Sequence, residues 1–324
     1  MRPVFPLKVP DSFLAEKSLK VSKLRFHLFG KLVVSRDAEV IKGLDSLKEQ
    51  ELLGFLLTHR RKHHSREALA TLLWPEAPPE KGKKYLRQAL WHLQGLLGPA
   101  ESDVFQVEQN WIVVNPESEI WSDVAVFEDA FAGVQGVPGQ QLNEETAQTL
   151  KDVASLYRGD LLDAWYHDWC LFERERLQNM YLTMLDKLLA YCGVHGDYDS
   201  GVNYGYALLS YDRARERTHR ELMRLKYLAG DRTGALRQYQ RCAAALGEEL
   251  GVEPDKRTRE LYEQIRSDSL PRNGNSGEFN IPTRGSLSEI LARLINLQHF
   301  LGSAQKHIQR DIQAVELELK SSKD

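Results

Sequence analysis

Short strand-like segments lie on both sides of a helical stretch in the first 115 residues, and this order limits the possible folds most. Apolar residues alternate over 24–29, resume at 32–34 after Gly30 and recur at 40–41, as in short strands. Two further strand-like runs follow at 104–107 and 111–114. The polar residues Gln109 and Asn110 form a turn between these last two runs, which predicts a β-hairpin.

Three helices are predicted between the two groups of strands. The first starts behind Ser46, a candidate N-cap with Glu49 three residues later, as in a capping box. The second starts at Ser65 and is stopped by Pro75. The third covers about 79–97 and ends at Gly98, which is followed by a proline. Strands, three helices and a hairpin therefore follow one another within a single small module.

From Trp121 to about Arg266 the pattern predicts helix throughout, interrupted by glycine-containing breaks. Two of these breaks, Gly196-Asp197 and Gly230-Asp231, lie 34 residues apart, which is the tetratricopeptide period. A small residue follows at the matching position after each break, as close helix packing requires. The second half of the chain is therefore predicted to be an all-α, tetratricopeptide-like domain.

Composition excludes several classes of protein. No apolar run reaches the length of a membrane span, and the N-terminus shows no secretory signal. The three cysteines, Cys170, Cys192 and Cys242, are widely spaced and are predicted to be reduced core residues of a cytoplasmic protein. Residues 23–115 carry more basic than acidic side chains, whereas 116–267 are clearly acidic. A basic module joined to an acidic one suggests a domain that binds polyanions, followed by a domain with a different function.

No catalytic motif occurs in the sequence. The patterns of nucleotide-binding loops, nucleophile elbows and zinc proteases are all missing. The cluster of His59, His63 and His64 has three cations within it and no helpful carboxylate or cysteine, so we expect an inter-helix turn and no metal site. The chain is predicted to be no enzyme and to need no cofactor.

The predicted third helix has two opposite faces. Its apolar face comprises Leu86, Leu90, Leu93 and Leu97. Its polar face comprises Lys84, Arg87, Gln88 and Trp91, at helical spacing. Lysine neutralises phosphates, whereas arginine and glutamine can pair bidentately with guanine and adenine. The second face therefore predicts a helix that reads double-stranded DNA.

The same elements resemble a known family. Residues 24–115 look like an OmpR/PhoB-type winged helix, and the stretch 65–75, SREALATLLWP, is similar to the Streptomyces antibiotic regulatory protein (SARP) family. Residues 121–266 resemble that family's bacterial transcriptional activator domain in 157–162 (YRGDLL), in the helix start at 169–176 and in 248–254 (EELGVEP). The resemblance covers about three quarters of the chain.

Together, the sequence patterns and the resemblance predict a mainly α architecture in five parts. A disordered arm at 1–22 precedes a winged helix at 23–115, built on a small sheet and a hairpin wing. An activator domain at 116–267, a flexible linker at 268–285 and a C-terminal helix at 286–324 follow.

The resemblance also implies a transcriptional activator that binds direct repeats near a promoter and recruits RNA polymerase holoenzyme. Carried onto this sequence, the groove-facing side chains are Lys83, Lys84, Arg87, Gln88 and Trp91, and the wing tip is Gln109 and Asn110. This tip lacks the arginine or lysine that is common in the family.

Two alternatives remain open from the sequence. The chain could be a tetratricopeptide-like adaptor whose winged helix binds protein, although such an adaptor has no need of the basic face. It could also be a regulator whose helical domain senses a small anionic or nucleotide effector, for which the candidate ligands are Tyr204, Arg213, Arg215 and Arg217.

The C-terminal segment carries the pattern of a coiled coil. Apolar residues recur in alternating steps of four and three over more than four heptads. The predicted dimerisation residues are Leu287, Leu291, Leu294, Leu301, Ile308, Ile312 and Val315. We therefore expect a homodimer; the competing arrangement is a helix that folds back onto the helical domain.

Overall fold

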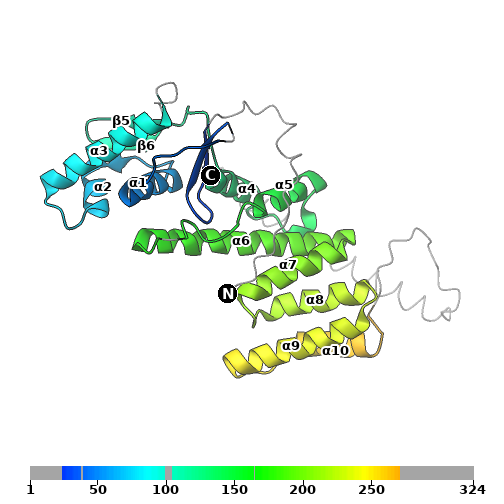
Figure 1. Cartoon of the computed structure of the whole chain (residues 1–324). Coiled ribbons are helices and arrows are strands. Elements are labelled where there is room, and N and C mark those ends of the chain that lie inside the picture. Colours follow the sequence, from blue (N-terminus) through cyan, green and yellow to red (C-terminus); the bar gives the residue numbers. More distant parts are fainter. Residues whose placement is uncertain (1–23, 38, 99–103, 164, 271–324) are drawn as a thin grey trace, which may run out of the picture. The chain divides into compact units, whose positions relative to one another are not determined.

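The computed structural model describes residues 24–37, 39–98, 104–163 and 165–270. The predicted N-terminal arm, most of the predicted linker and the predicted C-terminal helix with its dimerisation residues lie outside these residues. The described part is mainly helical with a small N-terminal sheet (Figure 1). No helix in it is both long enough and apolar enough to cross a bilayer.

The N-terminal sheet has four strands in the order β3-β2-β1-β7. The strands are β1 (Leu24–His27), β2 (Val33–Arg36), β3 (Glu39–Val40) and β7 (Ile120–Ser122). Strand β2 pairs antiparallel with both β1 and β3, whereas β7 runs parallel to β1. Leu24, Phe26 and Val34 on one face of this sheet are buried, as the alternating pattern predicted.

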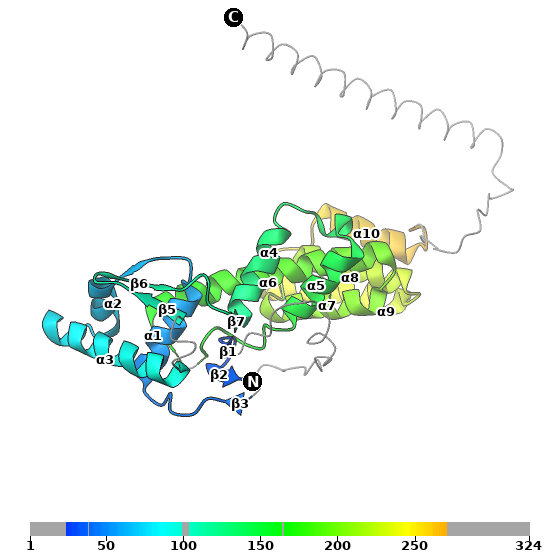
Figure 2. The same ribbon diagram turned by 90° about the horizontal axis from the view of Figure 1, so that it is seen from above.

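The three predicted helices and the predicted hairpin are confirmed. The helices are α1 (Leu47–Thr58), α2 (Arg66–Leu73) and α3 (Pro79–Leu97). The hairpin strands are β5 (Phe105–Val107) and β6 (Trp111–Val114), to which a short unpredicted strand β4 (His64–Ser65) adds on the β6 side. Figure 2 shows the three helices gathered with this hairpin.

The capping-box interpretation of Ser46 is wrong. Ser46 does precede α1, but its side chain makes no capping hydrogen bond. The Glu49 carboxylate contacts Nδ1 of His92 on α3 at 2.8 Å instead. The Glu49 carboxylate, which a capping box would direct to the start of α1, therefore contacts a residue of another helix. At α2 the prediction holds, because the Ser65 hydroxyl accepts the backbone N–H of Ala68.

The prediction of helix from Trp121 onwards is also wrong at its start, because residues 120–122 form β7. This strand lies against β1 with Leu24 opposite Ile120. A three-residue strand has too few residues to show a period, and its partner lies about a hundred positions earlier in the chain. Local pattern therefore could not reveal it.

The rest of the described chain is a succession of helices, of which α6 to α9 follow one another side by side (Figures 1 and 2). They are α4 (Asp123–Gly133), the 3-10 turn η3 (Gly139–Gln141), α5 (Glu144–Ala154), α6 (Asp168–His195), α7 (Tyr198–Tyr211), α8 (Glu216–Leu228), α9 (Arg232–Leu250) and α10 (Lys256–Arg266).

Both Gly-Asp breaks separate helices as predicted. Gly196 ends α6 in the left-handed conformation with φ 74°, and the Asp197 carboxylate caps α7. Asp231 caps α9 in the same way. The small residue after the first break is needed, because a Cβ on Gly201 would lie 2.7 Å from a methyl carbon of Leu225.

One hydrophobic core runs from the N-terminal sheet into the helical region. The Phe29 ring lies 5.1 Å from that of Phe127 and 4.9 Å from that of Tyr157. Backbone hydrogen bonds reinforce the contact, since the Leu162 N–H donates to the carbonyl of Leu28 at 2.9 Å. The three cysteines are buried, as predicted.

Candidate nucleic-acid interface

The apolar face of α3 is buried as its period predicted. Leu86, Leu90, Leu93 and Leu97 are 1%, 3%, 0% and 1% exposed. Gly82 of α3 lies against α2, where a Cβ would meet the Cβ of Ala70 at 3.6 Å, an ordinary van der Waals contact. The burial of this face fixes which side chains of α3 point outward.

The outward face of α3 carries Lys84, Arg87 and Gln88, all exposed, together with Trp91. The Trp91 side chain is 76% exposed, an unusual position for a large apolar ring. Neither Lys84 nor Arg87 forms an ion pair within the part of the chain that the structure describes. Two uncompensated cations, an amide and an aromatic ring therefore share one helix face.

Lys83 differs from its neighbour Lys84. Its ammonium lies 3.4 Å from the Glu80 carboxylate and 3.7 Å from that of Glu67, and the side chain is half-buried. Two nearby carboxylates offset its charge, so Lys83 presents a weaker positive field to an anion than Lys84 does.

The tip of the hairpin is held against the start of α2. Gln109 and Asn110 are exposed, and the Asn110 carbonyl accepts the backbone N–H of Arg66 at 2.9 Å. The Arg66 guanidinium donates to the Glu108 carbonyl at 3.2 Å. Arg66 therefore brings a positive charge next to the hairpin tip, whose own residues Gln109 and Asn110 are uncharged. It was missed because it lies more than 40 residues before the tip, and only the pairing of β4 with β6 brings the two together.

Of the three histidines near the end of α1, His59 and His64 make contacts within the fold, whereas His63 is exposed. The His59 ring stacks on Phe55 with 4.4 Å between ring centroids, and its Nε2 lies 3.4 Å from the Glu173 carboxylate. Burial lowers the pKa of His64. No group of three or more metal-ligating side chains occurs among the described residues.

The four predicted effector ligands are not brought together. Arg213 pairs with Glu248 at 3.2 Å, and Arg215 pairs with Asp186. Arg217 is exposed, whereas Tyr204 is half-buried on α7 and burial raises its pKa. Arg213 and Arg215 thus pair with carboxylates on different helices, α9 and α6, and none of the four predicted ligands lines either of the two hollows described next.

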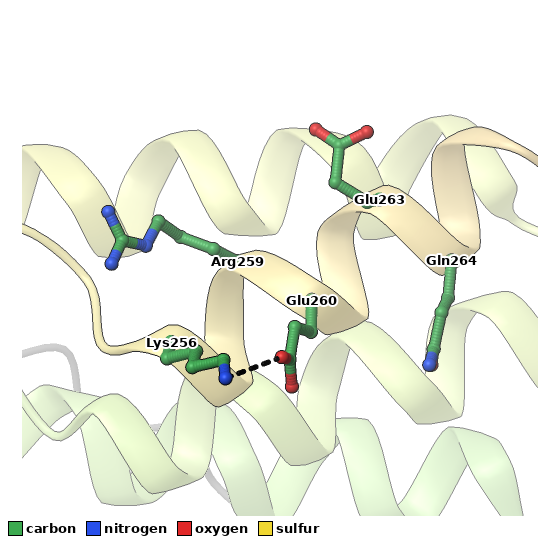
Figure 3. Close-up of a pocket in the computed structure, with 5 residues that line it drawn as sticks. All are labelled: Lys256, Arg259, Glu260, Glu263 and Gln264. Atoms are coloured by element: carbon green, nitrogen blue, oxygen red, sulfur yellow. Dashed lines mark ion pairs between the residues drawn. The ribbon is translucent and has the colours of Figure 1, made fainter.

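Two hollows in the described surface are lined by other residues. One, of about 650 Å³, lies along α10. Its lining charges come from a single helix, and the Lys256 ammonium lies 3.7 Å from the Glu260 carboxylate (Figure 3). The other, of about 500 Å³, lies over β1 and β2 and includes His27, Asp123 and Arg158. Every charged side chain that lines the first hollow belongs to an ion pair.

Comparison with known proteins agrees with the resemblance seen in sequence. The model of the bacterial transcriptional activator domain matches residues 122–266. The regulatory protein AfsR of Streptomyces coelicolor is 25% identical over 264 residues, which are 82% of this chain and 25% of AfsR. The transcriptional regulatory protein EmbR of Mycobacterium tuberculosis is 25% identical over 260 residues, 75% of this chain and 63% of EmbR.

The helical region of the chain thus matches the bacterial transcriptional activator domain, and the chain is similar to both regulators over most of its length.

A solved structure supports the fold. Mycobacterium tuberculosis EmbR in complex with a low-affinity phosphopeptide superposes with a TM-score of 0.58 at 23% identity, covering 77% of this chain and 66% of EmbR. The chain thus spans about a quarter of the length of AfsR and about two thirds of EmbR. The curated relatives are regulators by name, and none is named as an enzyme.

Proposed function

We propose that the chain is a cytoplasmic, non-enzymatic transcriptional activator that binds specific double-stranded DNA. The outward face of α3 carries this proposal, because it exposes unpaired cations, an amide and a tryptophan opposite a fully buried apolar face. Such a face offers phosphate contacts and base recognition on one helix. The activator domain at 122–266 and the names of the relatives support the regulatory role.

In this proposal residues 24–115 act as a winged helix with α3 in the major groove. Arg87 and Gln88 read base edges, and Lys84 neutralises phosphate. Trp91 supplies apolar contact, for instance to a thymine methyl group. We assign Lys83 a smaller share, because Glu67 and Glu80 already offset its charge.

The hairpin tip acts as the wing. Gln109 and Asn110 extend toward the minor groove or the neighbouring phosphates, and Arg66 provides the positive charge beside them. This places a cation of α2 and a polar turn of the hairpin at one contact with the DNA backbone.

The helices of 116–267 form a tetratricopeptide-like module that recruits RNA polymerase holoenzyme to the promoter. Residues 286–324 pair two copies on direct repeats through the apolar seam predicted from sequence. A dimer raises the effective concentration of the second winged helix at a two-site operator. Light scattering of the chain truncated at Gly285, against the full chain, tests this part.

The DNA-binding proposal is tested by selecting bound fragments from random DNA and measuring gel shifts on the selected site at rising salt. We expect an enriched sequence and a logarithmic salt slope that loses about 0.9 for each phosphate contact removed. Retention of random DNA without enrichment would contradict sequence-specific binding. An adaptor that binds only protein would retain no DNA at all.

A further inference from the structure

The start of α6 exposes large apolar side chains that the DNA interface does not use. Phe172 is 72% exposed and Leu171 is 43% exposed, and Tyr166 just before the helix is 78% exposed. The opposite face of the same turns is anchored in the core, where Cys170 and Leu177 are 0% exposed. The helix is thus rigidly held while its apolar residues face solvent.

Carboxylates flank these apolar side chains. Asp168, Leu171, Phe172 and Glu175 follow one another at the spacing of a single helix face, and all four are exposed. Neither Asp168 nor Glu175 forms an ion pair among the residues that the structure describes. We call these four residues the acidic–aromatic stripe.

Other charges nearby are already engaged within the fold. The Arg174 guanidinium donates to the Leu161 carbonyl at 2.6 Å and lies 5.7 Å from the centre of the Tyr166 ring. Arg176 pairs with Glu173 at 2.7 Å. The stripe therefore keeps its negative charge, because the neighbouring cations are bound elsewhere.

We infer that the acidic–aromatic stripe is a docking surface for a basic protein surface with an apolar centre on RNA polymerase holoenzyme. The sign of its charge separates it from the outward face of α3, since carboxylates repel phosphates and DNA is not its partner. An exposed aromatic side chain with charged residues beside it is typical of an interaction hot spot. A partner surface with lysine and arginine around an apolar centre complements it. This inference rests on the proposed function.

The decisive variant is Phe172→Ala, with Val194→Ala as its matched control. Val194 lies on the same helix and is 61% exposed, so both changes remove an exposed apolar side chain from α6. The test measures binding of purified holoenzyme from the same bacterium to the full chain on its selected operator, together with transcription in vitro. We expect Phe172→Ala to lower both by about tenfold, which corresponds to about 1.4 kcal/mol, while operator affinity in gel shifts and the circular dichroism spectrum stay unchanged.

Charge is tested with Glu175→Gln, against Glu144→Gln as a control at an exposed carboxylate on α5 that forms no ion pair with any residue the structure describes. We expect Glu175→Gln to weaken holoenzyme binding at low salt and to have little effect at high salt, because screening removes the attraction. Glu144→Gln should behave as the wild type at both.

Three outcomes overturn the inference. If Phe172→Ala activates as well as Val194→Ala does, the stripe does not dock the holoenzyme. If Phe172→Ala changes the mass of the free protein in light scattering, the stripe binds a second copy. If the wild type binds its operator but neither recruits holoenzyme nor activates, the proposed recruitment fails and the docking surface with it.

Discussion

The Asp123 carboxylate accepts the backbone N–H of Leu28 at 2.8 Å and so joins the start of α4 to the end of β1. The N–H groups of Phe29, at 3.0 Å, and Val124, at 2.7 Å, donate to the same carboxylate. Burial raises the pKa of Asp123 to about 6, although these three donors act to lower it. A buried acid thus links the N-terminal sheet to the helical region.

Replacing this acid changes how stability depends on pH. The folded protein holds the Asp123 proton more tightly than the unfolded chain, in which the pKa is 3.8. The contribution of this group to the free energy of unfolding therefore falls as pH rises from about 4 to about 6, and is constant above. We expect the wild type to lose about 3 kcal/mol relative to Asp123→Asn across this range in urea titrations. A constant difference in stability between the two proteins across this range would contradict the raised pKa of Asp123.

Some of this arrangement was readable from sequence and some was not. The two faces of α3 follow from a period that recurs over about three turns, so the burial of Leu90 and the exposure of Arg87 were predictable. Strand β7 and the contact of Arg66 with the hairpin depend on partners distant in sequence. The ion pair of Lys83 with Glu67 was missed for a related reason, because Glu67 reaches it from another helix. Whether the outward face contacts DNA stays a prediction.

Different residues on the outward face of α3 are expected to provide sequence specificity and overall DNA affinity. We expect Arg87→Ala and Gln88→Ala each to reduce discrimination between operator and random DNA by about 1–3 kcal/mol, because each removes contacts to base edges. Lys84→Ala should weaken binding to all sequences alike and flatten the salt dependence. Lys256→Ala removes an exposed lysine from α10 and should change neither. An unchanged operator-to-random ratio for Arg87→Ala would contradict the groove assignment.

Leu90→Ala should affect stability without changing specificity. The side chain is 3% exposed at the centre of the buried face of α3, and truncating a buried leucine costs about 2–5 kcal/mol. Leu72→Ala on α2, where the side chain is 40% exposed, should cost less than about 1 kcal/mol. Thermal unfolding measures both. A Leu90→Ala protein with unchanged melting temperature and a new operator preference would reverse the two faces.

His219 makes the helical region sensitive to acid. The Gln238 amide donates to its Nδ1 at 2.8 Å, and its Nε2 donates to the Arg213 carbonyl at 2.9 Å, so the buried ring is neutral. Burial lowers the pKa of His219 below 6.5. The unfolded chain therefore takes up this proton first, and stability falls as pH drops below 6.5. In urea titrations from pH 7.5 to 5.5 we expect His219→Gln to be less stable than the wild type but to lose less with acid; equal losses would contradict this role.

Gly139 marks the closest approach between η3 and α6. A Cβ at this position would lie 2.8 Å from the Cα of Lys187 and 2.9 Å from the Cβ of Ala190, so the backbone itself must move to accept one. We expect Gly139→Ala to lower the free energy of unfolding by about 1–3 kcal/mol, as overpacking does. Gly247 lies inside α9 with no atom within 4 Å of its Cβ position, and Gly247→Ala should raise stability by about 0.5–1 kcal/mol. Urea unfolding measures both variants. Changes of opposite sign in the free energy of unfolding are expected only if η3 packs against the α6 backbone. A stabilised Gly139→Ala would contradict that packing.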